Sequence, residues 1–228
     1  VSVTTPTMIP AEAQVAATTA RISRELGPVN VLVHNAVGGA WGDFQQIEPA
    51  VLQSNFSVNV MALLHLARAV APAMIDAGEG TILVTGNTSA YRGKAAFAGF
   101  APTKAAQRVL AESMARALGP RGIHVAYLAI DAVIDVPWAR ERLPDKPDDF
   151  FAKPSAIAEV AVASRLSSSP STGVATTSGT PAASQWASAF AAQASSSGVR
   201  PITIRSSEPS SRMSTSMPVS SRNGARRS

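Results

Sequence analysis

Apolar residues along this chain fall into two patterns, short continuous runs and longer stretches with helical spacing. Continuous runs rich in β-branched residues are typical of parallel strands covered by helices on both faces. Three such runs lie at residues 29–34, 81–86 and 123–130. Segments with apolar residues at helical spacing alternate with them, at residues 10–26, 49–77, 101–118 and 154–166. The alternation predicts an α/β protein whose core is an incomplete doubly wound parallel sheet flanked by helices.

The composition changes near residue 164, and this change divides the chain into two parts. We expect one domain over residues 1–166 and a separate tail over residues 167–228. The tail is rich in serine, threonine and arginine and poor in leucine and isoleucine, a composition typical of disorder. An alternative interpretation is that the tail is translated out of frame.

Charge and composition exclude several classes of protein. The net charge is +5, but residues 1–164 hold 13 basic and 14 acidic side chains, so the excess belongs to the tail. A nucleic-acid partner is therefore not expected, because no aromatic residues are interleaved with the arginines. The chain has no cysteine, which excludes disulfides and thiolate sites. The longest apolar run, residues 58–75, contains His65 and Arg68, so we expect no membrane span. We expect the protein to be cytoplasmic.

The most informative motif opens the predicted helix 101–118. Phe100 and Lys104 stand four positions apart, directly after the strand predicted over residues 81–86. This spacing resembles the Tyr-x-x-x-Lys signature of short-chain dehydrogenases/reductases, a family with a Rossmann-like fold. The resemblance implies that the residue at position 100 should be the acid/base and that Lys104 should hold the nicotinamide ribose. Phenylalanine cannot transfer a proton.

Further positions match the catalytic residues of the same family. Asn59, on an apolar helical face, matches the helix asparagine whose backbone binds a water that links the lysine to solvent. A satisfied core amide is an equally open interpretation of Asn59. Residues 80–93 align without gaps with Gly-x-Ile-Val-Asn-Ile-Ser-Ser-x-x-Gly-x-x-Gly. The catalytic serine then falls on Asn87, whose amide could donate to a substrate carbonyl. Ser89, two residues later, could do so only if the loop shifts, and a polar loop without a catalytic part is an equally open interpretation.

The resemblance also implies contacts with NAD or NADP. Asn35, Ala36 and Gly38 resemble the Asn-Asn-Ala-Gly element after the fourth strand of the family, with His34 in place of the first asparagine. Downstream, Val133 matches the apolar position of the family's Pro-Gly-x-Ile-x-Thr segment, whose backbone orders the carboxamide. In that segment Ile130 and Asp131 replace Pro-Gly, and Asp135 replaces threonine.

One expected element does not occur in the printed sequence. No Thr-Gly-x-x-x-Gly-x-Gly loop precedes residue 34, and such a loop would hold the pyrophosphate at a helix N-terminus. The chain also begins with Val1, which suggests a fragment or a processed protein. We therefore expect this chain to bind a dinucleotide weakly.

These observations predict an NAD(P)-dependent oxidoreductase that acts on a small-molecule carbonyl, alcohol or activated alkene. Lack of the tyrosine at position 100 predicts weak or no activity in this chain. The alternative is a non-catalytic Rossmann-like binding or oligomerisation module. A homo-oligomer is expected in either case, because members of the family assemble through the helices that match residues 49–77 and 101–118. The remaining rival is a nucleic-acid binder that uses the arginine tail.

Overall fold

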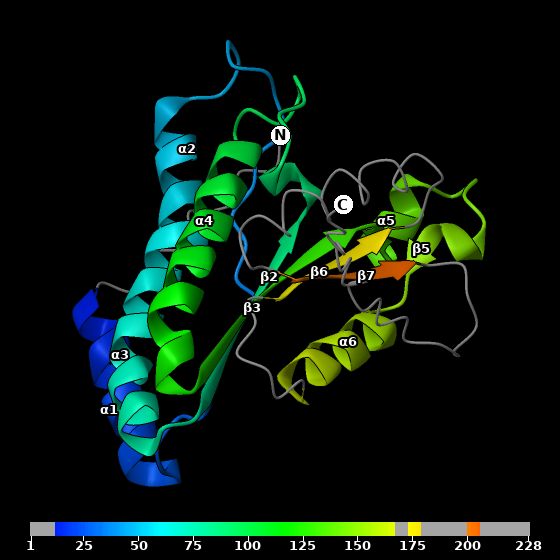
Figure 1. Ribbon diagram of the computed structural model, residues 1–228. Helices are drawn as coiled ribbons and strands as arrows, with labels where there is room; N and C mark the ends of the chain where they lie inside the picture. The colour runs from blue at the N-terminus through cyan, green and yellow to red at the C-terminus, as the bar shows by residue number, and fades with distance from the viewer. Residues whose placement is uncertain (1–11, 167–172, 179–199, 206–228) are drawn as a thin grey trace, which may run out of the picture.

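A five-stranded parallel sheet forms the centre of the computed structural model, which describes residues 12–166, 173–178 and 200–205 (Figure 1). Neighbouring strands in the sheet follow the order β1-β2-β3-β6-β7, and every pair is parallel. The strands are β1 (Val31–His34), β2 (Gly80–Asn87), β3 (Ile123–Asp131), β6 (Gly173–Ser178) and β7 (Arg200–Arg205). The prediction of an α/β fold with a doubly wound parallel sheet is confirmed.

Helices cover both faces of this sheet (Figure 1). One face carries α1 (Glu12–Leu26), α2 (Pro49–Phe56), a π-helical turn (Ser57–Met61), α3 (Ala62–Ala77) and α4 (Ala101–Leu118). The opposite face carries α6 (Pro154–Leu166). Within the first group, α3 and α4 pack directly on the strands, and α1 packs against α3.

Shorter elements complete the described part of the chain. A separate two-stranded parallel sheet pairs β4 (Val133–Ile134) with β5 (Phe151–Ala152), and α5 (Pro137–Arg142) lies between them in sequence. Single 3₁₀ turns follow β2 at Thr88–Ala90, follow α4 at Gly119–Arg121, and precede β5 at Asp148–Phe150. The chain therefore leaves the main sheet after β3 and returns to it through α6.

The core follows the two-residue repeat of the strands. On β2, Ile82 and Val84 face the large apolar cluster under α3 and α4, whereas Leu83 between them faces α6. The same alternation continues on β3, where Val125 aligns with Ile82 and Ala126 aligns with Leu83. Because the register is in phase, each face of the sheet buries apolar side chains against its own helices.

Predicted and observed boundaries agree where the sequence contains a helix-stop signal. The helix over residues 101–118 ends before Gly119-Pro120, and α6 begins at Pro154, as expected for proline in a first turn. The first strand is shorter than predicted, because it begins at Val31 rather than at residue 29. The helix predicted over residues 49–77 is interrupted by the π-helical turn, which apolar spacing alone does not reveal.

Two short segments within residues 167–228 form strands. We expected no regular structure there, yet β6 and β7 both belong to the main sheet. Period-two alternation was the available signal, since Ile202 and Ile204 alternate with Pro201 and Thr203. The abundance of serine and arginine around these segments outweighed it. The remaining residues of the predicted tail lie outside the described ranges.

Within the described residues, one helical segment is long and apolar enough to cross a membrane by length and composition. It is Pro49–Ala77, which includes α2, the π-helical turn and α3. Its apolar side chains Leu63, Val70 and Met74 are buried in the cluster above β2 and β3. The apolar character of this segment is thus explained by its place on the sheet.

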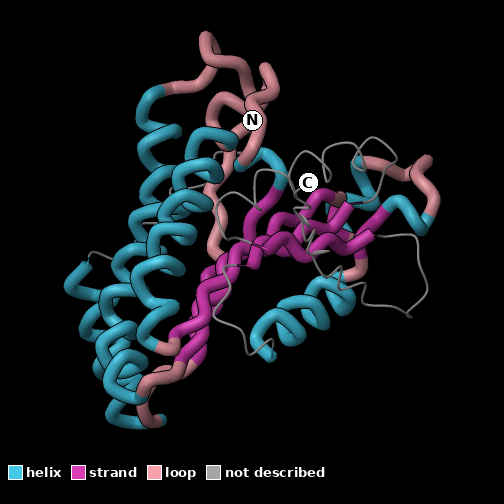
Figure 2. The backbone as a smooth tube through the Cα atoms, in the orientation of Figure 1, coloured by secondary structure: helices cyan, strands magenta, loops and turns pink. Residues whose placement is uncertain are grey.

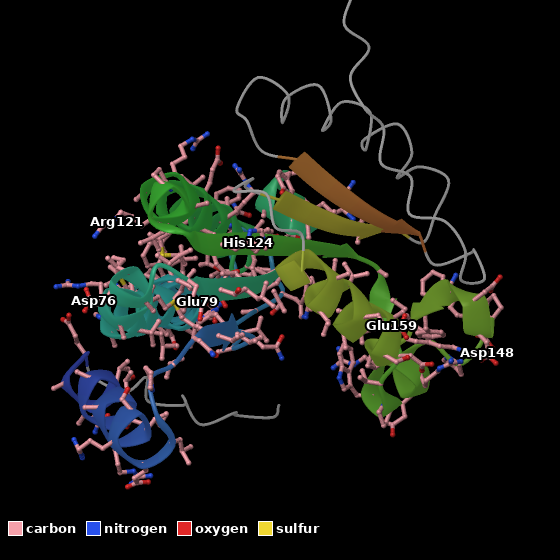
Figure 3. All side chains as sticks on the ribbon, turned by 60° about the horizontal axis from the view of Figure 1, so that its bottom comes forward. Asp76, Glu79, Arg121, His124, Asp148 and Glu159 are labelled. Atoms are coloured by element: carbon pink, nitrogen blue, oxygen red, sulfur yellow. The ribbon has the colours of Figure 1, made fainter. Side chains whose placement is uncertain are left out.

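The amino and carboxyl ends of the strands carry different side chains. At the amino ends of β2 and β3, charged and polar residues gather around the connections from the preceding helices. Figure 3 labels four of these residues, Asp76, Glu79, Arg121 and His124. The candidate site residues from β1, β2 and α4 lie at the opposite, carboxyl ends of the strands. Ligands bind at the carboxyl ends of the strands in folds of this type.

Candidate active site

The loops that follow β1 and β2 lie side by side above the carboxyl ends of the strands (Figure 2). Gly42 pairs with the second loop in a parallel bridge, because its N–H donates to the Ala96 carbonyl at 3.0 Å and its carbonyl accepts from the Ala98 N–H at 3.2 Å. The Trp41 ring packs edge-on against Phe97, with centroids 4.5 Å apart. These contacts hold the two loops together at the edge where the site forms.

Asn59 fixes the first of these loops to the start of α4. Its Oδ1 accepts from the Gly38 N–H at 2.9 Å, and its Nδ2 donates to the Gly38 carbonyl at 2.7 Å and to Thr103 Oγ1 at 2.8 Å. Thr103 Oγ1 in turn donates to the Phe100 carbonyl at 2.8 Å. Asn59 is fully buried, and its side chain is the satisfied core amide that the sequence analysis left open.

Close approach of the loop to the helix requires glycine at position 38. A Cβ built on Gly38 would lie 2.9 Å from Asn55 Oδ1 and 3.1 Å from the Asn55 Cα. Asn55 Nδ2 is itself engaged, because it donates to the Gly99 carbonyl at 2.7 Å. Two asparagines one helical turn apart therefore hold both loops against the helix, and sequence reasoning identified only Asn59 as part of the site.

Phe100 precedes the first residue of α4 and is buried, with 8% of its surface exposed. A Cβ on Gly39 would lie 3.1 Å from the Phe100 ring, so the loop backbone packs directly against it. The Trp41 ring is tilted over it with a centroid distance of 6.0 Å. Lys104 Nζ lies 5.8 Å from the Phe100 centroid, at the outer limit of a cation–π contact. The aromatic residue and the lysine of the motif are thus neighbours.

Lys104 is buried, with 3% of its surface exposed. Its Nζ donates to Gln107 Oε1 at 3.0 Å and to the Thr85 carbonyl of β2 at 3.3 Å. Burial lowers the pKa of the Lys104 ammonium from 10.5 to about 8. Lys104 is therefore a buried residue and not a solvated lysine at a helix start.

Gln107 belongs to this centre, and the sequence analysis missed it. It is fully buried on α4, and its Nε2 donates to the Asn59 carbonyl in the π-helical turn at 2.8 Å. The available signal was a polar side chain three residues after Lys104, on the same helix face as the buried Ala111. Gln107 joins the lysine to the helix that carries Asn59.

His34 closes the same centre from β1. Its Nδ1 lies 3.3 Å from Gln107 Nε2, and 1% of its surface is exposed. Burial, together with the charge of Lys104, lowers the pKa of His34 from 6.5 to about 4. His34 is therefore neutral near pH 7, and its Nδ1 accepts from the amide, which places its proton on Nε2.

Asn87 and Ser89 lie at the end of β2 and bond to one another. Asn87 Oδ1 accepts from the Ser89 N–H at 3.1 Å and caps the short 3₁₀ turn. Both side chains are half-buried. Their predicted part in polarising a substrate stays a prediction, since the structure shows them bonded within their own turn and not to the lysine centre.

The predicted cofactor residues lie at three different places. Asn35 follows the last residue of β1, and its Oδ1 accepts from Thr85 Oγ1 at 2.7 Å. The carbonyl of Thr85 accepts a hydrogen bond from Lys104. Ala36 is exposed in the following loop. Gly38 lies against Asn59. Val133 belongs to β4 in the small second sheet, so it is attached to a separate element.

Asp135 is neutralised by a neighbouring arginine. Arg140 Nε and Nη2 bond to the two carboxylate oxygens of Asp135 at 2.7 and 2.9 Å. This hydrogen bonding lowers the pKa of Asp135. Arg140 also pairs with Asp148, and its guanidinium lies 4.1 Å from the Phe151 centroid. Asp135 therefore belongs to an ion-pair network beside the second sheet.

Tyr91 does not replace the hydroxyl that position 100 lacks. Its oxygen is buried, and Arg108 lies over its ring at 4.8 Å from the centroid. Burial raises the pKa of Tyr91 above its ordinary value. A raised pKa makes the phenol a weaker acid and leaves little phenolate near neutral pH, so Tyr91 is a poor acid/base as well as a buried one.

Taken together, these contacts describe a buried cation beside an aromatic ring, with no proton-transfer group on that ring. Lys104 donates two hydrogen bonds within the described residues, and an ammonium has three N–H groups. The third can bind a hydroxyl or a phosphate oxygen of a ligand. Among the described residues no cluster of three or more His, Asp or Glu side chains could hold a metal ion.

Comparison with known proteins places these residues in a family. The model of the short chain dehydrogenase family matches residues 3–145, more than half of the chain. The 3alpha-hydroxysteroid dehydrogenase of Mediterraneibacter gnavus is 32% identical over 117 residues, which cover 51% of this chain and 47% of that protein. The 7alpha-hydroxysteroid dehydrogenase of Escherichia coli K12 is 34% identical over 110 residues, 48% of this chain and 43% of that protein. The chain matches about half the length of these relatives.

Solved structures show the same fold. A short-chain dehydrogenase from Streptomyces avermitilis superposes with a TM-score of 0.64 at 21% identity, over 82% of this chain and 74% of that one. A gluconate 5-dehydrogenase from Burkholderia cenocepacia, solved with NADP and tartrate, gives a TM-score of 0.59 at 23% identity, over 70% of this chain and 65% of that one. Because the family model matches more than half of the chain, this chain belongs to the short-chain dehydrogenase/reductase family.

Proposed function

We propose that this protein is an NAD(P)-dependent oxidoreductase scaffold whose acid/base chemistry is impaired by phenylalanine at position 100. The observation that carries the proposal is the pairing of a buried ring with a buried lysine, 5.8 Å apart from centroid to Nζ. The family places an ionisable phenol where this ring lies. A benzyl ring fills that space and has no proton to transfer.

The described residues fit a nicotinamide cofactor on one side. Lys104 has one N–H available for a ribose hydroxyl. Asn35 is close to Lys104 because both bond to Thr85. When bound, NAD(P)H would supply the hydride for a carbonyl substrate. Asn87 and Ser89 at the end of β2 would polarise that carbonyl, since an amide N–H or a hydroxyl can donate to a developing oxyanion. Val133 would contact the carboxamide through its backbone.

The direct test is to restore the missing hydroxyl. In Phe100→Tyr, the phenol would lie beside Lys104, and a positioned acid/base contributes about 100- to 10,000-fold to rate. We expect NAD(P)H oxidation with a panel of ketones, and NAD(P)⁺ reduction with hydroxysteroids, to be near background in the wild type and to rise by at least about 100-fold in the variant. The matched control is the double variant Phe100→Tyr/Lys104→Ala.

Two outcomes would contradict the proposal. Turnover by the wild-type chain above that of Lys104→Ala would show that position 100 does not limit activity. A Phe100→Tyr variant that binds cofactor by calorimetric titration, yet gains no activity, would show that the ring does not occupy the acid/base position. Titration of NAD(H) and NADP(H) is therefore performed on every variant.

A non-catalytic binding or oligomerisation module is the second candidate. Val51, Phe56 and Val109 on α2 and α4 are exposed, at 37%, 40% and 53%, and exposed apolar side chains on these helices could meet another copy. Absence of dinucleotide binding together with a stable oligomer by sedimentation would favour this candidate. A small-molecule substrate, a homo-oligomer and a cytoplasmic location remain part of the main proposal.

A further inference from the structure

The ammonium of Lys104 is held by neutral groups alone. No carboxylate among the described residues pairs with it, and its acceptors are the Gln107 amide oxygen and the Thr85 carbonyl. The titratable side chain that senses its charge is His34 on β1. Phe100 on α4 contributes only its ring, and the π-helical turn reaches the lysine through Gln107. A buried cation without a counter-charge depends strongly on each hydrogen bond it makes.

The orientation of the Gln107 amide is fixed by its partners. Lysine can only donate, so the atom that faces Lys104 Nζ must be Oε1. A carbonyl can only accept, so the atom that faces the Asn59 carbonyl must be Nε2. A flipped amide would place two donors together and two acceptors together. Gln107 therefore has one favourable orientation between α4 and the π-helical turn, and His34 Nδ1 accepts its remaining N–H.

We propose that Gln107 is the positioning residue of the candidate active site, whose buried amide holds the Lys104 ammonium beside position 100 and ties it to the π-helical turn. A neutral amide fixes the direction of the ammonium without supplying an opposing charge. A carboxylate at the same position would fix it more strongly and would also stabilise the charged form of the lysine. An apolar side chain would do neither.

This difference gives a test that needs neither cofactor nor substrate. The chain contains four lysines, at positions 94, 104, 146 and 153, so the side-chain carbons of isotope-labelled lysine can be resolved by NMR and titrated with pH. The signal of Lys104 is identified by its loss in Lys104→Arg. The variants are Gln107→Glu, nearly the same shape with a carboxylate, and Gln107→Met, unbranched and without a hydrogen-bonding amide. Ser113→Ala, on an exposed position of the same helix, is the control.

We expect the two variants to move the titration of Lys104 in opposite directions. In Gln107→Glu the midpoint rises by about 1 to 3 pH units, because an opposite charge favours the ammonium. In Gln107→Met it falls below the wild-type value of about 8, because the charged form loses an acceptor. Ser113→Ala leaves the midpoint unchanged.

A merely structural role for Gln107 predicts a different result. If the side chain only fills space, both variants admit water and both midpoints move up toward the ordinary lysine value. That outcome, or an unchanged midpoint in Gln107→Glu, overturns the proposal. Should Gln107→Met fail to fold in a urea titration, Gln107→Leu, also without an amide, replaces it, because the midpoint of Gln107→Glu rises for either role. The proposal concerns the site described under Proposed function, but the NMR result stands whether or not Phe100→Tyr gains activity.

Discussion

The lysine centre and the loop after β2 differ in how their polar groups are satisfied. In the centre, Asn59, Lys104 and Gln107 are buried and bond to residues from other elements. In the loop, Asn87 and Ser89 are half-buried and bond to each other within one turn. The hydrogen bonds of the centre therefore depend on the tertiary structure, whereas those of the loop join residues that are close in sequence.

The same contrast divides the residues that the sequence predicts to match the family. Asn59 and Lys104 lie in the centre, where a change would leave several buried groups without partners. Asn87, at the predicted serine position, lies in the loop, where substitution disturbs few contacts. Phe100, at the predicted tyrosine position, precedes α4 between the two regions.

The largest loss of stability should come from removing the hydrogen bonds of the Asn59 side chain. Asn59→Ala leaves the Gly38 peptide and Thr103 Oγ1 without their side-chain partners in a buried site. We expect the free energy of unfolding, measured in urea, to fall by about 4 kcal/mol. The matched change in the loop, Asn87→Ala, removes one cap bond and should cost about 1 kcal/mol. Similar losses at the two positions would contradict the contrast between centre and loop.

A pH titration of stability should show a smaller effect, at His34. The pKa is 6.5 in the unfolded chain and about 4 in the folded one, so between these values the unfolded chain binds the additional proton. The free energy of unfolding therefore falls as the pH is lowered from 6.5 to 4, by about 3 kcal/mol from this residue. The stability is fully present above pH 6.5.

Carboxylates also titrate in this range, so the measurement is the difference from His34→Asn at each pH. Asparagine is the residue that the resemblance predicts at this position, and its amide can accept from Gln107 without titrating. A pH dependence that is the same in both proteins would mean that His34 titrates alike in the folded and the unfolded chain, and the network drawn around Gln107 would be wrong.

The smallest effect should accompany removal of the buried charge. Lys104→Met eliminates a cation whose burial lowers its pKa to about 8, a cost of about 3 kcal/mol at pH 7. Loss of its two hydrogen bonds offsets part of this gain, so we expect the variant to be more stable by about 1 to 2 kcal/mol. The wild type should gain stability as the pH rises from 8 toward 10.5, because the folded lysine loses its proton first, and the variant should lack this slope. A destabilised variant would argue that Lys104 supports the fold.

Much of the fold could be predicted because its signals are local. Continuous β-branched runs predicted β2 and β3, and the Gly119-Pro120 pair marked the end of α4. β6 and β7 were missed because short strands next to serine-rich segments have little pattern of their own. They gain their backbone partners only from β3 and from each other, and such long-range pairing is not written in any one window of sequence.

The candidate site could be predicted in part, for the same reason. Spacing identified Phe100 and Lys104, since they lie one helical turn apart. Gln107 was missed because its importance depends on the Asn59 carbonyl, 48 positions earlier in the chain. The π-helical turn that presents this carbonyl was missed as well, because it adds a wider turn without changing the apolar character of the helix.

The bridge between Gly42 and the second loop has a mechanical consequence. Since backbone hydrogen bonds connect these loops on both sides of Gly42, neither can swing open without breaking the bridge or carrying the other with it. Trp41 travels with Phe97 in any such motion, and it is exposed enough, at 65%, to report on solvent. In a variant whose other two tryptophans are replaced, the fluorescence of Trp41 would therefore record any joint motion of the two loops.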